Sequence, residues 1–123
     1  MGLPYTHVVQ AKAGQGVSYV MLYDPLFNNN RVYEYADPGT QYPAGKSSGP
    51  YGGTGNGVQS IDAGTDKYGV NAVDMLLVGG DAWMHSDTDG WHHLMSGVSQ
   101  LSGGQQGLAA LLDQSGNVWY YNE

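Results

Sequence analysis

The stretch Val58-Gln-Ser-Ile-Asp-Ala-Gly64 decides the fold, because variants of it stand at two other places in the chain. Val8-Val-Gln-Ala-Lys-Ala-Gly14 and Val98-Ser-Gln-Leu-Ser-Gly-Gly104 share its form, Val-x-x-apolar-x-small-Gly. The three opening valines are 50 and 40 residues apart. Repeats of roughly 40 residues that hold several short strands are typical of β-propeller blades. The sequence therefore predicts an all-β chain built from repeated small sheets.

Each repeat is followed by a short apolar run and then by a strand with a large aromatic side chain. The apolar runs are residues 17–23, 70–78 and 108–112, and the aromatic residues at the common position are Tyr33, Trp83 and Trp119. Near-continuous apolar runs of this length indicate strands that are covered on both faces. A further strand, residues 91–95, is visible only in the second unit. We therefore expect one domain, residues 1–123, with up to four strands in each of the units 8–37, 58–97 and 98–123.

Residues 38–57 interrupt the repeat with a stretch rich in glycine and proline, which predicts a loop without a strand. Three blades do not close a ring, because propellers need about four to eight. We expect residues 1–7 to supply a closing strand to the third unit of a neighbouring copy, which makes the chain a homo-oligomer. Two alternatives stay open: a piece of a longer propeller, and an open stack of sheets with unpaired edges.

Composition limits the partners that this chain can have. The net charge is −7 and only Lys12, Arg31, Lys46 and Lys67 are basic, so neither a nucleic acid nor an anionic membrane surface is an expected partner. The chain has no cysteine, and no apolar run approaches membrane-spanning length. Residues 1–5 lack the basic and apolar regions of a signal peptide. Either the mature form begins there or the protein stays inside the cell.

The repeat resembles that of a known propeller family. The form Val-x-x-apolar-x-Ala-Gly, the stretch Asp113-Gln-Ser-Gly-Asn-Val-Trp-Tyr-Tyr121 and the stretch Gly90-Trp-His-His-Leu94 are similar to the tectonin-type propeller repeat. The resemblance covers nearly all of the chain outside residues 38–57. It implies a lectin-like protein, extracellular or on the cell surface, that binds sugars or cell-wall glycans between blades. The second unit departs from the pattern at residues 78–81, so no sugar site transfers position by position.

The candidate ligand-binding residues lie in and around the turn Ser86-Asp-Thr-Asp-Gly90. Trp91 follows this polar turn directly, where we expect it to be partly exposed, and Asp87 and Asp89 offer carboxylates beside it. The repeated aromatics, Tyr33, Trp83 and Trp119, have two interpretations: they fill equivalent positions between neighbouring sheets, or they are stacking platforms for a sugar ring.

Metal binding and catalysis have weaker support. Asp87 and Asp89 at i and i+2 resemble the start of a calcium loop, but no acidic residue follows at the required distance. His85 faces at most one of His92 and His93, because neighbouring strand residues point to opposite sides. No nucleophile elbow or phosphate-binding loop is present. We therefore expect no cofactor, no metal and no enzyme, but a non-catalytic glycan-binding module; the alternative is a structural protein that self-assembles into rings or filaments through blade edges.

Overall fold

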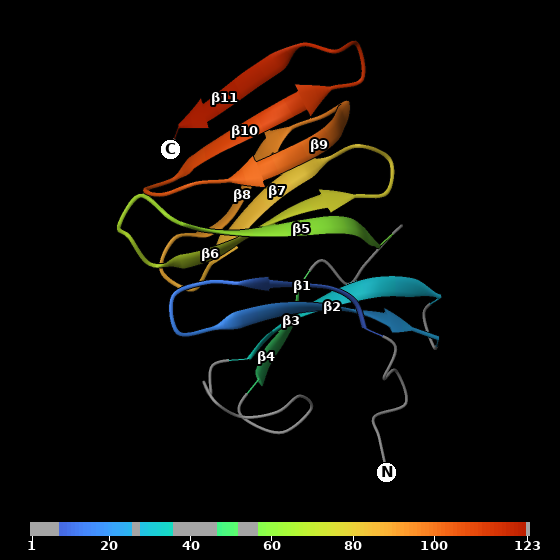
Figure 1. Cartoon of the computed structure of the whole chain (residues 1–123), viewed down its shortest axis with the longest axis vertical. Coiled ribbons are helices and arrows are strands. Elements are labelled where there is room, and N and C mark those ends of the chain that lie inside the picture. Colours follow the sequence, from blue (N-terminus) through green and yellow to red (C-terminus); the bar gives the residue numbers. More distant parts are fainter. Residues whose placement is uncertain (1–7, 26–27, 36–46, 52–56, 123) are drawn as a thin grey trace.

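The computed structural model describes residues 8–25, 28–35, 47–51 and 57–122, with the backbone alone for 47–51. In these residues the chain forms eleven strands in three antiparallel sheets and no helix, which confirms the predicted all-β class. The first sheet consists of β1 (Val8–Ala13), β2 (Ser18–Asp24), β3 (Asn29–Tyr35) and β4 (Ser47–Tyr51), the second of β5 (Val58–Thr65), β6 (Asn71–Leu77), β7 (Ala82–Ser86) and β8 (Gly90–Met95), and the third of β9 (Val98–Gly103), β10 (Leu108–Asp113) and β11 (Val118–Asn122). The sheets are stacked in chain order (Figure 1).

Strand β4 corrects the prediction that residues 38–57 contain only a loop. Its residues Ser47 and Ser48 pair with Tyr35 and Glu34 of β3. Gly49 and Pro50 lower the strand propensity of the segment, and this hid it in the sequence. An edge strand needs only one row of backbone groups for pairing, so a residue without an N–H is tolerated there.

The register of the strands repeats from sheet to sheet. In the pairs β2–β3, β6–β7 and β10–β11, the aromatic residues stand opposite apolar ones: Tyr33 opposite Val20, Trp83 opposite Met75 and Trp119 opposite Leu111. These three partners in turn stand opposite Ala11, Ile61 and Leu101, the apolar residues of the repeated motif. The three aromatic residues therefore occupy the same structural position.

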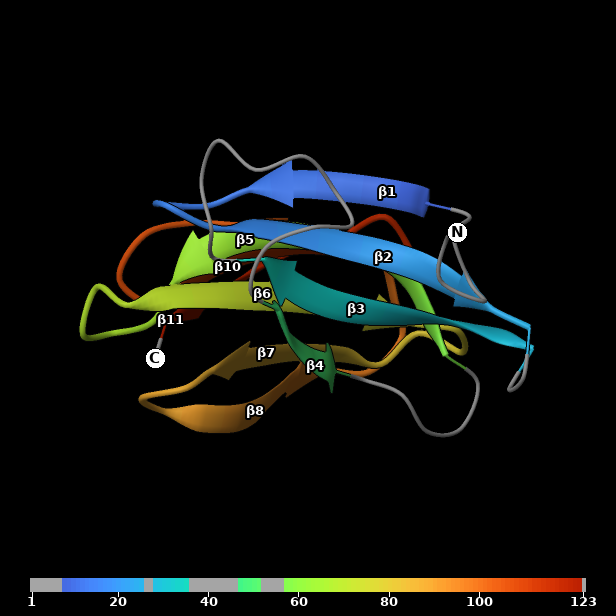
Figure 2. The same cartoon turned by 90° about the horizontal axis from the view of Figure 1, so that it is seen from below.

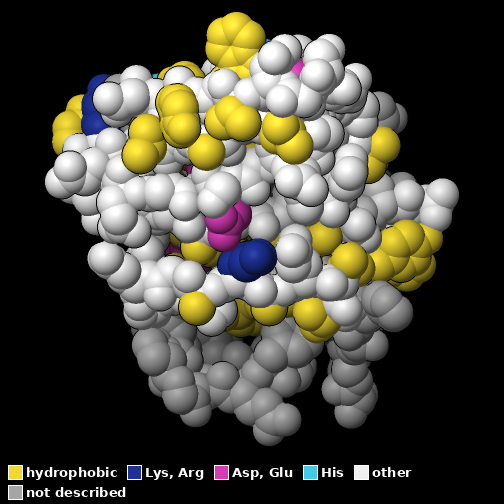
Figure 3. All heavy atoms as spheres, turned by 45° about the horizontal axis from the view of Figure 1, so that its top comes forward, with side chains coloured by type: hydrophobic (Ala, Val, Ile, Leu, Met, Phe, Trp, Pro, Cys, Tyr) yellow, Lys and Arg dark blue, Asp and Glu magenta, His cyan; other side chains and the backbone are white. Residues whose placement is uncertain are grey.

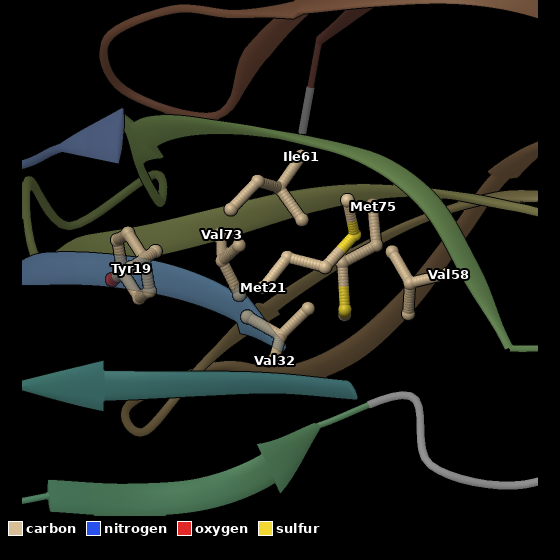
Figure 4. Packing of buried hydrophobic residues seen from close by; sticks show 7 residues of the cluster. All are labelled: Tyr19, Met21, Val32, Val58, Ile61, Val73 and Met75. Carbon is tan, nitrogen blue, oxygen red and sulfur yellow. The ribbon is translucent and has the colours of Figure 1, made fainter. Parts of the chain in front are cut away.

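Two apolar clusters hold the three sheets together. The first lies between the first and second sheets and consists of Tyr19, Met21, Val32, Val58, Ile61, Val73 and Met75, whose side chains point toward one another (Figure 4). The second consists of Leu76, Ala82, Val98 and Leu111 and joins the second sheet to the third. Strand β6 contributes Val73 and Met75 to the first cluster and Leu76 to the second, so it buries one face against each neighbouring sheet, which explains its continuous apolar run.

The glycine that ends the repeated motif allows the second and third sheets to approach closely. A Cβ atom on Gly64 would lie 2.5 Å from the carbonyl oxygen of Gly104. The sheets are joined there by the hydrogen bond from the Thr65 N–H to the Gly104 carbonyl, 2.9 Å long, and nearby by the bond from the Gly103 N–H to Asp62 Oδ2, 2.8 Å. In the second sheet the motif therefore ends in glycine because backbone atoms of the third sheet occupy the space of a side chain.

Of the two interpretations of the repeated aromatic residues, burial between neighbouring sheets does not hold in the third sheet. Trp119 is 52% exposed. In the second sheet, rings of β8 lie beside the equivalent Trp83, with His93 4.8 Å away between centroids. Strand β11 lies at the edge of its sheet, so Trp119 has no such neighbour among the described residues. The predicted closing strand, residues 1–7, lies outside the described residues.

Within the described ranges, no helix has the length and apolar character needed to cross a bilayer.

Candidate functional site

The hairpin of β7 and β8 carries a group of four rings on one face, which we call the aromatic row: Trp83, His85, Trp91 and His93. Trp83 pairs with His93 and His85 pairs with Trp91 across the two strands. Ring centroids are 4.8 Å apart in the first pair and 4.5 Å in the second, and the two indoles meet edge to face at 6.2 Å. Trp91 is 46% exposed. The row therefore offers one accessible indole held in place by packed rings.

The aromatic row faces the first sheet. Trp83 and His85 pair with Met75 and Val73 of β6, and both of these belong to the cluster between the first and second sheets. Strand β3 contributes Glu34 to the same side, because Val32, two residues earlier, belongs to that cluster. The outer part of the junction between the two sheets therefore combines aromatic rings from one sheet with a carboxyl group from the other.

Charges at this junction influence one another. Burial raises the pKa of the Glu34 carboxyl; a hydrogen bond with the Tyr19 side chain opposes this rise and the charge of Asp87 adds to it. Burial also lowers the pKa of His85, and the charge of Asp87 opposes the shift. Asp87 itself is exposed at the hairpin turn. The charge of Asp87 therefore acts on one titratable group from each of the two sheets.

Asp89 is directed to other partners. Its carboxylate lies 2.9 Å from His92 Nε2 and 3.9 Å from Lys67 Nζ. Its backbone N–H donates to Ser86 Oγ, and that hydroxyl donates to the buried Asp66. These contacts tie the β7–β8 turn to the β5–β6 turn, so Asp89 has a structural role there.

The repeated aromatics do not form a shared site, because each belongs to a different sheet. Tyr33 stands opposite Val20 on β2, whose neighbours Tyr19 and Met21 face the second sheet, so Tyr33 points away from that sheet. Trp119 donates its indole N–H to Asp113 Oδ2, 2.9 Å away. Of the predicted aromatic residues, only Trp83 therefore lies beside Trp91.

The Asp113 carboxylate organises the β10–β11 turn. It accepts hydrogen bonds from the backbone N–H groups of Ser115 and Asn117, at 2.9 and 2.8 Å, and from the Trp119 indole. The Trp119 bond is the largest of the effects that lower the pKa of Asp113, to about 2. The exposed indole thus serves to fasten a turn.

This contact predicts a pH-dependent signal from Trp119. Because the folded-state pKa of Asp113 is depressed, the stabilisation that it provides is present above its unfolded pKa, near 4, and is lost as the pH falls toward about 2. In two-dimensional NMR, the Trp119 indole N–H resonance should titrate with a midpoint of about 2. The titration should vanish in the variant Asp113→Asn. A wild-type midpoint near 4 would contradict the hydrogen bond.

The histidines of the second sheet lie on both faces of the β7–β8 hairpin. His85 and His93 share a face, whereas His92 points to the other. Ser96 Oγ lies 3.5 Å from His93 Nε2 and donates instead to Asp81 Oδ1, which the same histidine nitrogen also contacts at 3.1 Å. Ser96 and His93 therefore share one Asp81 oxygen as a hydrogen-bond partner. The described residues contain no group of three or more potential metal ligands.

Sequence reasoning missed a polar groove that crosses the first strands of all three sheets. It encloses about 340 Å³ and is lined by Gln10, Lys12, Gln59, Ser60, Ile61, Asp62, Ser99, Gln100 and Leu101. Two of its polar side chains have structural tasks: Gln10 Oε1 accepts from the Ile61 N–H and Asp62 Oδ2 accepts from the Gly103 N–H. In the sequence, the groove could have been found only from the polar residues at the x positions of the motif Val-x-x-apolar-x-small-Gly.

Comparisons of the chain with protein-family models, with curated proteins and with solved structures find no match.

Proposed function

We propose that this chain is a non-catalytic, lectin-like glycan-binding module in which the aromatic row receives a sugar ring. The observation that carries the proposal is the half-exposed Trp91, supported from behind by Trp83 and His85. Small-molecule sites combine aromatic surface with a few polar groups that fix orientation. A pyranose presents an apolar face of C–H groups for the indole and hydroxyls that donate to carboxylates, and Asp87 and Glu34 supply such acceptors.

We further propose that the three sheets are blades of a propeller of the tectonin type. Strand β5 lies beside both β1 and β9, so the first strands of the sheets are neighbours. In Figure 2 both four-stranded sheets run from their first strand at the top to their fourth strand at the bottom. This common direction supports blades arranged around an axis near the first strands. The extracellular or cell-surface location implied by the resemblance belongs to the same proposal.

The test of glycan binding compares two exposed aromatic residues. On a glycan array, the variant Trp91→Ala should bind about 10- to 100-fold more weakly than the wild type, because a central aromatic anchor contributes about 2 kcal/mol or more. The matched control is Tyr68→Ala, since Tyr68 is 62% exposed in the β5–β6 turn, outside the aromatic row. Asp87→Asn should reduce binding to a smaller extent.

The control variant decides how a loss is interpreted. Tyr68→Ala should retain the wild-type glycan profile. If Trp91→Ala binds as tightly as the wild type, the aromatic row is not the site. If the wild-type protein binds no glycan at all, the whole proposal is wrong.

A second candidate function is a structural protein that self-assembles into rings or filaments through sheet edges. The observation that favours it is the position of β11 at the edge of its sheet, where the described residues leave one row of backbone groups without a neighbouring strand. Such edges pair readily with other chains. Electron microscopy of the ligand-free protein tests this candidate: rings or filaments would support it, and isolated particles of one or two chains would contradict it.

A further inference from the structure

The third sheet has one face that no other described element covers, and we call it the outer face. Leu111 packs against the second sheet, so Leu108, Ala110 and Leu112 on either side of it point away. Their partners across the strands, Val118 and Tyr120, share this direction. Leu108, Val118 and Tyr120 are 44%, 59% and 77% exposed. Figure 3 shows hydrophobic side chains gathered at the upper end of the molecule, where Figure 1 places β10 and β11.

The strand register shows that the outer face of the third sheet is equivalent to the face that each of the other two sheets buries against the sheet that follows it. Leu112 and Val118 pair with each other. The pair at the same register is Met21 with Val32 in the first sheet and Leu76 with Ala82 in the second. Those four side chains are at most 1% exposed, because the following sheet covers them. The outer face thus continues a series of two established sheet–sheet interfaces.

The distribution of charge favours a second copy of this chain as the partner. The protein has eleven acidic and four basic residues, so two copies repel each other over most of their surface. Between Val98 and Asn122 the only charged residue is Asp113, and its carboxylate is bonded to the Trp119 indole. Trp119 pairs with Leu111 and therefore points to the opposite side from the outer face. The outer face is therefore a surface on which two acidic copies meet without repulsion.

The shape of the outer face is suited to contact with itself. A groove of about 290 Å³ crosses it, lined by Gln100, Leu101, Ser102, Ala110, Leu111, Leu112 and Val118. Tyr120 projects beside this groove, since it pairs with Ala110. In a contact with two-fold symmetry the same pair of residues meets twice, once in each direction. One protrusion and one groove on each copy are therefore enough: each protrusion enters the groove of the other copy. The Tyr120 hydroxyl finds acceptors in the amide of Gln100 and the hydroxyl of Ser102.

The first sheet is a poorer partner for this face. Its side chains directed away from the second sheet include Val20 and Leu22, which are only 6% and 1% exposed. These two side chains therefore offer little apolar surface to a second chain. We therefore propose that two copies associate through their outer faces, sheet against sheet, with Tyr120 of each copy in the groove of the other. The resulting dimer is closed, and it requires neither glycan binding nor pairing of sheet edges.

The first experiment measures association by sedimentation equilibrium. The wild-type chain should be a dimer at micromolar concentration. The variant Val118→Lys should raise the dimer dissociation constant at least about 100-fold, because it places an unpaired charge in an apolar contact. The matched control is Val78→Lys, since Val78 is 48% exposed in the turn between β6 and β7. It should leave the constant within about 3-fold of the wild type. Circular dichroism at low concentration should show that both variants keep the strand content of the wild type.

The second experiment identifies the surfaces in contact. The chain has no cysteine, so single cysteines can be introduced without interference. A short bismaleimide should join Val118→Cys to itself and Tyr120→Cys to itself. Ala11→Cys, on the face of the first sheet that points away from the second, should not be joined to Val118→Cys in a mixture.

Three outcomes would overturn the inference. A monomer up to about 100 μM would mean that the outer face does not bind a second copy. Cross-linking of Ala11→Cys to Val118→Cys would show head-to-tail stacking of the first sheet on the third. A dimer that resists Val118→Lys would show association through another surface, such as the β11 edge.

Discussion

Replacing Met75 by alanine is expected to lower the free energy of unfolding by about 3 kcal/mol. Met75 is completely buried in the cluster between the first and second sheets. It lies opposite Ile61 on β5 and Trp83 on β7, so its side chain packs between these two neighbours within the second sheet and also against the first sheet. The substitution leaves a cavity that the paired backbones on both sides cannot close. For a small domain, a loss of this size is a large share of the total stability.

Urea denaturation followed by circular dichroism measures the Met75 effect. Val78→Ala is the control, since this side chain is 48% exposed and its truncation should cost less than about 0.5 kcal/mol. The slope of the free energy against urea should be the same in both variants and in the wild type. A cost below about 1 kcal/mol for Met75→Ala would show that the first two sheets are not packed as described.

Replacing Gly64 by alanine is also expected to lower the free energy of unfolding by about 3 kcal/mol. Here the cause is an added atom that overfills the space between two sheets, whereas Met75→Ala leaves a cavity. The new Cβ atom would meet the carbonyl oxygen of Gly104 at 2.5 Å and its nitrogen at 3.2 Å. Both are backbone atoms, so the third sheet has to move as a whole. The movement strains the hydrogen bonds from Gly107 N–H and Gln106 N–H to Thr65. The lower chain entropy of unfolded alanine offsets only about 0.4–1 kcal/mol of this cost.

Gly14→Ala is the matched control, because Gly14 occupies the same position of the repeated motif in the first sheet. Its new Cβ atom would meet Asn71 Oδ1 at 2.9 Å and Val17 Cγ2 at 3.0 Å. These are side-chain atoms, and the Asn71 amide can shift by a few tenths of an ångström while it keeps its two hydrogen bonds with the Gln15 backbone, so the cost should stay near 1 kcal/mol. Thermal unfolding should therefore rank wild type, Gly14→Ala and Gly64→Ala in order of falling stability. Equal losses at the two positions would contradict the close approach of the second and third sheets.

Most strands could be predicted from the sequence because their apolar residues form short continuous runs between turn residues. The runs at 70–78 and 108–112 became β6 (Asn71–Leu77) and β10 (Leu108–Asp113). Strand β4 could not be predicted, since an edge strand holds its place through backbone pairing and leaves little trace in its side chains. The sequence could not decide between the two interpretations of Trp119, burial between sheets and a stacking platform, for a related reason: burial depends on what lies beyond an edge, and residue type does not reveal it.

The candidate site was predictable only in part. Trp91 and Asp87 were selected for their place at a polar turn; the structure places Trp91 among the rings of the aromatic row and Asp87 at the exposed turn before it. Asp89 could not be separated from Asp87 by sequence spacing, since a hydrogen-bond network with His92 and Ser86 directs it elsewhere. Glu34 joins the site from another sheet, and no local pattern connects it to the β7–β8 hairpin.

By itself, the sequence determined the local properties of this protein. The repeated motif, the apolar runs and the Gly-rich turns specify short strands and three antiparallel sheets, because strand formation depends on neighbouring residues and on the turns between them. The tertiary structure alone decided which faces are buried. Met21 and Leu112 hold the same register position in their sheets, yet a following sheet covers only the first. Packing between sheets depends on contacts between residues far apart in the chain, and these contacts leave Trp91 and the outer face of the third sheet exposed to solvent.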